Sequence, residues 1–463
     1  MSTLKRISRV APIAAGLLLA GACDTLNIAD PNDPDKVRVL ADATSVEGLA
    51  LGALKSWFNV TQAMDPNGAL TTMANNYTAS WNNFQMRIYS SVPRVSWQNS
   101  LTSTARVEIE SFWYGYYAAL SSTNDVVYSS RVLGVFKGRT DSAMVENLAY
   151  LLQGLTVGQV ALNYDQGFVV DYNSDLSKLP IETRQQMRDW ALAKLDTAIA
   201  MANANTYTWP DAWTTAATNA AGCGGGEPRA HAPAPCTNVS VKQIASTMAA
   251  RLLAYFPRGA SETQTAAEWD RVKAYAANGI SSTTPFDFGF VGDGCVKFCD
   301  ELRLWSNDIT TMRTDTRVAN MLDTSQHTPW PDPSGNPRPG GDPNHAPSAD
   351  KRLNDGTYGS ATLAPSVHTV PADAGAGTDY AWDSIAIFRP ARGQYHQSNI
   401  GQIRYDYLGF SAPDGSGGGF GFAPVFLAAE NEPLTSPTSR VKIKRHRAWR
   451  NRPCPIAANP QPG

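Results

Sequence analysis

Apolar side chains recur every three to four residues through much of the first 280 residues, and this spacing predicts amphipathic helices. In the strongest pattern, Val145, Leu148, Leu152 and Leu155 share one face of a helix. The predicted helices cover residues 45–60, 105–130, 141–164, 183–202, 240–255 and 266–277. We therefore expect a mainly α-helical chain.

These helices follow one another in pairs about 35–50 residues apart, which is typical of tetratricopeptide-like hairpins. Such a hairpin buries its apolar face only by stacking on its neighbours. Small residues stand where partner helices would cross, namely Ala118, Gly158 and Ala249. Ser240 and Gln243 fit a capping box that would begin the fifth helix. The predicted helical body lies mostly at residues 43–280.

Two long stretches lack a helical period. Residues 62–103 are rich in Asn, Ser, Thr and aromatic side chains, and residues 281–425 alternate short apolar runs with Gly- and Pro-rich loops. We expect little regular structure in either stretch.

The amino terminus has the pattern of an export signal. Lys5, Arg6 and Arg9 precede an apolar run of 12 residues that is too short to span a bilayer. Small residues then precede Cys23, as in the bacterial lipobox, with Ala20 where Leu is usual. We expect residues 1–22 to be a lipoprotein signal peptide, Cys23 to be lipidated, and residues 23–42 to form a tether. The alternative is an ordinary secretory signal followed by an unmodified cysteine.

The remaining cysteines suit an oxidising compartment. Cys223 and Cys236 flank a Gly/Pro-rich insert, and Cys295 and Cys299 lie close together, so that each pair is a candidate disulfide. A metal site is the alternative, but the spacing is poor for zinc and the histidines are scattered. We expect no metal and no cofactor. Cys454 is left without a partner.

Charge and motifs exclude several classes of function. The net charge of −2 gives no electrostatic case for nucleic-acid binding. We find no metalloprotease, nucleotide-binding or serine-hydrolase motif, and expect the protein not to be an enzyme. No later segment has the apolar length of a membrane-spanning helix.

The segment at residues 77–99 combines aromatic rings with amides and arginine, which suits a binding site. Aromatic faces stack on sugars or on peptide side chains, while amides and guanidinium groups orient the ligand by hydrogen bonds. The candidate ligand-binding residues are Trp81, Asn82, Asn83, Phe84, Arg87, Trp97 and Asn99, with Trp305 as a later addition. The alternative is that these aromatic residues only hold a long loop against the helices.

In order along the chain, several segments resemble the RagB/SusD family of nutrient-uptake outer-membrane lipoproteins. They are CDTLNIADPNDPD, FWYGYYAALSSTNDVV, LLQGLTVGQVALNYDQGFVVDY, WALAKLDTAIAMAN, MAARLLAYFPR, WDRVKAYAANGI, RGQYHQSNIGQIRYDY and PVFLAAENEPL. Their ordered combination carries the resemblance, because most of them are helix-packing patterns. Residues 43–432 would then form one SusD-like domain.

The resemblance implies a SusD-like α-superhelix with a long, irregular, ligand-facing region. It also implies a location at the surface of the outer membrane and a partner, a SusC-like TonB-dependent transporter. The lipoprotein would act as the lid of that transporter and capture oligosaccharides or peptides. By their order in the chain, residues 70–100 and 295–332 match the regions that form the family's ligand sites. The alternative function is a lipid-anchored, tetratricopeptide-like scaffold that binds a protein partner and no small ligand.

The last 31 residues, 433–463, depart from this resemblance. Pro433 follows Glu432 directly, where the family continues with a helix, and the tail carries seven Lys or Arg residues and no acidic residue. Two interpretations stay open at this point: a frameshifted or truncated ending, and a genuine basic tail that contacts anionic lipid.

Overall fold

The computed structural model describes residues 36–79, 88–89, 100–103, 106–214, 221–225, 235–259, 262–281, 286–290, 312–322, 380–382 and 400–402. Within these ranges no helix is long and apolar enough to cross a membrane.

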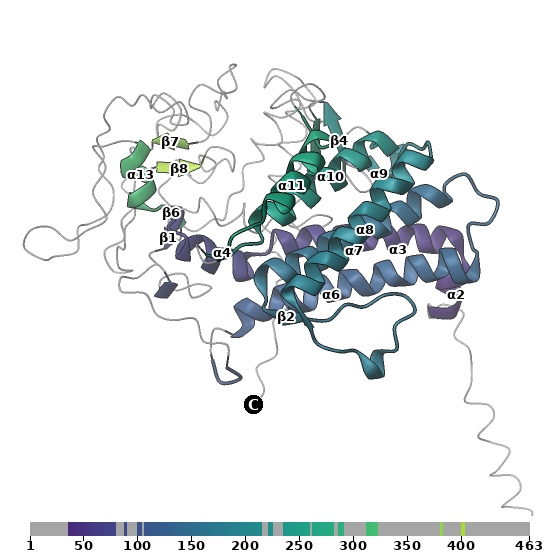
Figure 1. The fold of residues 1–463 in the computed structure, drawn as a ribbon, viewed down its shortest axis with the longest axis horizontal. Helices are drawn as coiled ribbons and strands as arrows, with labels where there is room; N and C mark the ends of the chain where they lie inside the picture. Colours follow the sequence, from purple (N-terminus) through teal and green to yellow (C-terminus); the bar gives the residue numbers. More distant parts are fainter. Residues whose placement is uncertain are drawn as a thin grey trace, which may run out of the picture.

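Six long helices form the helical body, and each packs against the helix before it and the helix after it (Figure 1). They are α3 (Ala43–Thr61), α6 (Arg106–Tyr128), α7 (Ser142–Asn163), α8 (Arg184–Ala204), α10 (Asn238–Tyr255) and α11 (Ala266–Ala277). The prediction of a mainly helical chain built from stacked hairpins is confirmed, since helices that are neighbours in the sequence are also neighbours in space.

The short helix α2 (Lys36–Ala41) lies within the predicted tether but belongs to the body. It packs on α3 and on the π-helical turn η3 (Ser129–Leu133) that ends α6. Leu40 is buried, and the Lys36 Nζ atom lies 3.0 Å from an Asp125 carboxylate oxygen. Helix α2 thus occupies residues 36–41, within the range predicted to be the tether.

A helix also forms where the sequence predicted an irregular stretch. This helix, α4 (Met64–Met73), packs against α6 although its sequence is rich in loop-forming residues. Its polar side chains are satisfied locally, because the Thr72 hydroxyl donates to the carbonyl of Ala69 at 2.9 Å and the Asn67 amide donates to the carbonyl of Ala63 at 2.7 Å. Pro66 lies in the first turn, where a missing N–H is tolerated.

Helix α10 begins three residues earlier than the Ser240–Gln243 capping box predicted. The N-cap is Thr237, and the capping box pairs it with Ser240, whose backbone N–H lies 3.2 Å from the Thr237 hydroxyl oxygen. Ser240 is therefore the third residue of the helix and not, as the sequence predicted, its N-cap. The two overlapping motifs differ by three residues, and only backbone geometry distinguishes them.

Helix α7 is the centre of the body, with 17 of its 22 residues buried. Gly158 makes close contact as predicted, since a Cβ atom there would lie 3.2 Å from Leu252 of α10. Ala249 is fully buried, but Ala118 is exposed, which is contrary to the prediction. The close crossing of α3 and α6 occurs at Gly115 instead, where an added Cβ would overlap the Val60 side chain.

The loops of the body carry short elements. Strands β2 (Gln166–Gly167) and β3 (Glu182–Thr183) pair antiparallel, with the 3-10 turn η4 (Leu176–Lys178) between them. The turn α9 (Asp211–Thr214) buries Trp213, whose indole N–H donates to Glu47 of α3 at 2.9 Å. These contacts fix the connection between α8 and α10 against the start of the body.

Short regular elements also interrupt the region after residue 280. Strand β6 (Met312–Thr314) pairs antiparallel with β1 (Tyr77–Ala79), and helix α13 (Thr316–Leu322) follows it. Strands β7 (Tyr380–Trp382) and β8 (Ile400–Gln402) form another antiparallel pair. The Arg317 guanidinium donates to the Asn75 side chain at 3.0 Å, which reinforces the β1–β6 contact.

Strand β4 (Ala221–Gly225) pairs antiparallel with β5 (Phe286–Phe290) at one side of the body. Cys223 of β4 forms a disulfide with Cys236, just before α10, and the two Cα atoms are 4.9 Å apart. This is the pairing that the sequence predicted. Through it the β4–β5 pair is covalently tied to the start of α10.

Candidate functional site

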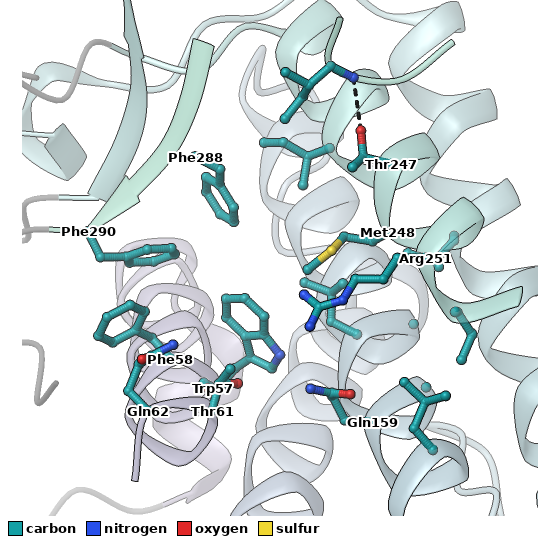
Figure 2. A pocket seen from close by; sticks show the side chains of 18 residues that line it. Trp57, Phe58, Thr61, Gln62, Gln159, Thr247, Met248, Arg251, Phe288 and Phe290 are labelled. Carbon is teal, nitrogen blue, oxygen red and sulfur yellow. Dashed lines mark hydrogen bonds between the residues drawn. The ribbon is translucent and has the colours of Figure 1, made fainter. Parts of the chain in front are cut away.

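A cavity of about 290 Å³ lies among α3, α7, α8, α10 and strand β5 (Figure 2). Aromatic side chains from α3 and β5 form one side of it, and aliphatic side chains from the remaining helices form much of the rest. The lining residues are Trp57, Phe58, Thr61, Gln62, Gly154, Leu155, Gly158, Gln159, Leu162, Leu195, Ile244, Thr247, Met248, Arg251, Leu252, Ile280, Phe288 and Phe290.

We call Trp57, Phe58, Phe288 and Phe290 the aromatic wall. Phe288 and Phe290 alternate on β5 and so project from the same face of the strand. The Phe290 ring stacks on Phe58 with centroids 4.3 Å apart, and the Phe288 ring lies 6.4 Å from that of Trp57. Figure 2 shows these rings gathered beside the cavity. Such contacts fix the ring positions, because aromatic pairs prefer stacked or edge-to-face geometry.

Strand β4 and the disulfide support the aromatic wall. Cys223 lies directly opposite Phe288 in the β4–β5 register, and both bridged cysteines are buried. Trp209 packs edge-on against Phe288 with centroids 6.4 Å apart. The insert before α10 therefore positions one side of the cavity.

The segment between α11 and β5 is anchored on α10. The backbone N–H of Ile280 donates to the Thr247 hydroxyl at 2.9 Å, and that hydroxyl donates to the Gln243 carbonyl at 2.9 Å (Figure 2). A Cβ at Gly279 would lie 2.6 Å from the same hydroxyl oxygen, so a larger residue would disturb this contact. The anchor fixes the residues that directly follow α11 on α10.

A hydrogen-bonded group lies where α3 meets α6 and α7. The Thr61 hydroxyl donates to the Trp57 carbonyl at 2.7 Å, and its oxygen lies 3.3 Å from the Tyr116 hydroxyl oxygen, within hydrogen-bond distance. Burial raises the pKa of Tyr116 to about 12, and hydrogen bonds with Thr61 and Gln159 oppose that shift. The Tyr116 hydroxyl is thus protonated and neutral near pH 7.

Trp57 has a buried polar atom without a partner. Its side chain is 5% exposed, and its Nε1–H group makes no hydrogen bond within the described part of the chain. In Figure 2 the nitrogen edge of the indole points toward Gln159. An unsatisfied buried donor is costly, and in a native structure it calls for an explanation.

Arg251 is the cationic group of the cavity. Its residue is exposed, and its guanidinium extends from α10 toward the side of the cavity that Trp57 forms (Figure 2). The guanidinium carbon lies 5.6 Å from the Tyr255 ring centroid. No carboxylate in the described ranges forms an ion pair with Arg251, whereas Arg184, Arg188 and Arg258 all have one.

The cavity can therefore bind a ligand whose apolar part packs against the aromatic wall. A few hydrogen-bond donors can bind the polar end of such a ligand. Within the described residues there is no group of three or more His, Cys, Asp or Glu side chains that could hold a metal ion.

Most of the residues predicted from sequence lie outside the described ranges. These are Cys23, Trp81, Asn82, Asn83, Phe84, Arg87, Trp97, Asn99, Cys295, Cys299 and Trp305. Their assigned roles stay predictions.

Two aromatic residues of the segment at 77–99 are described, and both are buried. Tyr77 and Tyr89 are each 3% exposed, and Tyr89 packs with Ala69 of α4. For these two the alternative interpretation holds, since they fix the chain against its neighbours and present little surface to a ligand. The β1–β6 pairing places the start of this segment beside residues 312–314, within the second predicted region.

The sequence did not predict the cavity. Trp57 lies within the first predicted helix, at residues 45–60, and the alternation in FDFGF at residues 286–290 is a strand signal within a loop-rich stretch.

Comparison with known proteins finds little. No protein-family profile matches the chain, and no curated protein matches it. A crystal structure of a SusD-like protein from Bacteroides fragilis is similar over 52% of this chain and 39% of that chain, with 14% sequence identity and a TM-score of 0.33. This chain therefore spans less than half the length of that structure.

Proposed function

We propose that this protein is a substrate-binding lipoprotein that acts as the lid of a SusC-like TonB-dependent transporter. The observation that supports the proposal best is the agreement between sequence order and packing. The segments that resemble the RagB/SusD family occur in order on α6, α7, α8, α10 and α11, and these helices pack one after another in the same order.

In this proposal Cys23 carries the lipid anchor at the outer membrane, and the residues between Cys23 and α2 allow the body to move relative to the transporter. The protein acts by capture and release, with no chemical change in the ligand. Oligosaccharides or peptides bind at the aromatic and amide side chains around Trp81 and Trp97.

The anchor is tested by mass spectrometry of the chain after expression in a bacterium that processes lipoproteins. We expect a lipid adduct at Cys23 and recovery in the outer-membrane fraction. The Cys23→Ser variant should lose both, whereas Cys454→Ser should keep both. Recovery of the unmodified chain in the soluble fraction would contradict the proposal.

The partner and ligand are tested together after gentle solubilisation of the outer membrane. We expect copurification with a large barrel protein, binding of oligosaccharides or peptides in a panel, and no cleavage products. Trp81→Ala and Trp97→Ala should weaken ligand binding, while Trp269→Ala, which alters an exposed tryptophan on α11, serves as the matched control. If both variants bind as the unaltered chain does and only a protein partner is retained, the scaffold alternative is correct.

A further inference from the structure

We propose that the cavity behind the aromatic wall is a second binding site, specific for a small molecule that joins an aromatic ring to a carboxylate. The proposal uses other residues than the segment around Trp81 and Trp97 and does not depend on the transporter proposal. Three observations support it: the lining of the cavity, and, among the described residues, a Trp57 donor without an acceptor and an Arg251 guanidinium without a carboxylate partner.

The side chains that line the cavity favour a ligand with an apolar ring. The aromatic wall offers ring faces and edges, and the facing surface is formed by leucine, isoleucine and methionine side chains. A volume of about 290 Å³ suits one fused ring system with a short substituent, near the lower limit of ordinary ligand pockets. A sugar fits this lining poorly, since each buried hydroxyl would need its own hydrogen-bond partner.

The polar groups at the cavity favour a ligand that carries a negatively charged hydrogen-bond acceptor. The Trp57 Nε1–H group can only donate, and no described residue accepts from it. The Arg251 guanidinium also only donates, and it is positively charged. A carboxylate has enough acceptor sites to serve both donors, and the charge-assisted bonds it forms are stronger than those of a neutral acceptor.

Several other arginines of the body, namely Arg184, Arg188 and Arg258, pair with nearby carboxylates. Arg188, for example, lies 3.0 Å from Glu268 and 2.8 Å from Asp189. Arg251 differs, because among the described residues it contacts the Tyr255 ring and pairs with no carboxylate. An arginine at a cavity without a counter-ion favours an anionic ligand over a neutral or cationic one.

The experiment is isothermal titration calorimetry on the full chain in non-ionic detergent, with a detergent blank. The probes are indole-3-acetate, its uncharged analogue indole-3-ethanol, and maltose. We expect saturable binding of indole-3-acetate, about tenfold weaker binding of indole-3-ethanol, and no heat from maltose at this site.

Variants locate the binding within the chain. Arg251→Met keeps an unbranched side chain, removes the guanidinium, and should weaken indole-3-acetate binding about tenfold, with no effect on indole-3-ethanol. Trp57→Phe keeps a ring and removes the N–H donor, so it should weaken binding of both probes. Arg106→Met, which removes an arginine that does not line the cavity, at the first residue of α6, should change neither.

Absence of saturable binding would overturn the proposal, as would equal affinity for the acid and the alcohol, or an unchanged affinity in Arg251→Met. Circular dichroism of each variant separates loss of binding from loss of fold. Trp81→Ala and Trp97→Ala should leave indole-3-acetate binding unchanged, so that this site and the proposed transporter function succeed or fail separately.

Discussion

Glycine residues set how closely the central helices approach. At Gly154 on α7, an added Cβ would lie 2.6 Å from the Leu195 Cγ atom and 3.0 Å from the Ala191 carbonyl oxygen of α8. The carbonyl belongs to the backbone and cannot rotate away. At Gly52 on α3 there is no atom within 4 Å of the corresponding position.

We therefore predict opposite effects for two identical substitutions. Gly154→Ala should lower the free energy of unfolding by about 1–3 kcal/mol through overpacking. Gly52→Ala should raise it by about 0.5–1 kcal/mol, because alanine loses less backbone entropy than glycine in a helix. Urea denaturation followed by circular dichroism measures both, and equal shifts in the two variants would contradict the packing argument.

Glu268 connects the start of α11 to α8. Its carboxylate accepts the backbone N–H of Thr265 at 2.9 Å and lies 3.0 Å from an Arg188 guanidinium nitrogen. The Thr265 backbone bond is the main cause that lowers the pKa of Glu268 below its ordinary value, and the Arg188 charge adds to it.

The sign of the resulting pH dependence follows from linkage. A carboxyl group whose pKa is lower in the folded than in the unfolded state stabilises the fold at a pH above its unfolded-state pKa. This contribution is lost as the pH falls through the folded-state pKa. Glu268→Gln should therefore reduce the loss of stability on acidification below the ordinary pKa of a glutamate. Thermal unfolding between pH 3 and 7 measures this, with Glu182→Gln as a control that lacks an ion pair among the described residues. Parallel pH profiles for Glu268→Gln and the unaltered chain would contradict the prediction.

At the scale of elements, the insert between α8 and α10 ties the aromatic wall to the body. The disulfide closes a loop over a sequence separation of 13 residues and joins β4 to the residue before Thr237, the N-cap of α10. We predict that Cys223→Ala with Cys236→Ala lowers the free energy of unfolding by about 3 kcal/mol, since the unfolded chain regains the entropy of the open loop.

The same double variant should weaken indole-3-acetate binding, because β5 loses the support of β4. Reduction of the unaltered chain with dithiothreitol is the matched control and should reproduce both effects. If stability falls while the environment of Phe288 stays the same by nuclear magnetic resonance, the disulfide does not position the aromatic wall.

Elements also show what local sequence patterns predict well. The period of apolar residues located α3, α6, α7, α8, α10 and α11 to within a few residues, because helix periodicity depends on near neighbours in the chain. The apolar period does not predict α4, whose polar side chains donate hydrogen bonds to nearby backbone carbonyls. It also misplaced the start of α10, where two capping motifs overlap.

At the scale of the whole molecule, burial is concentrated at one helix. Of the 22 residues of α7, 17 are buried, whereas α11 has none that is buried. We predict that amide hydrogens of α7 exchange slowest and those of α11 much faster, since α11 can open without exposing the centre of the body. Hydrogen exchange with mass spectrometry measures this, and equal protection of the two helices would show that the stack unfolds as one unit.

The sequence by itself determined the six long helices, their order, the candidate Cys223–Cys236 pair and the resemblance on which the proposed function rests. Each of these depends on residues close together in the chain or on their order along it. Only the tertiary structure decided that Trp57 of α3 meets Phe288 of β5, that no described carboxylate pairs with Arg251, and that Tyr77 is buried. Those facts depend on contacts between segments far apart in the sequence, and no local period records which distant side chains share a cavity.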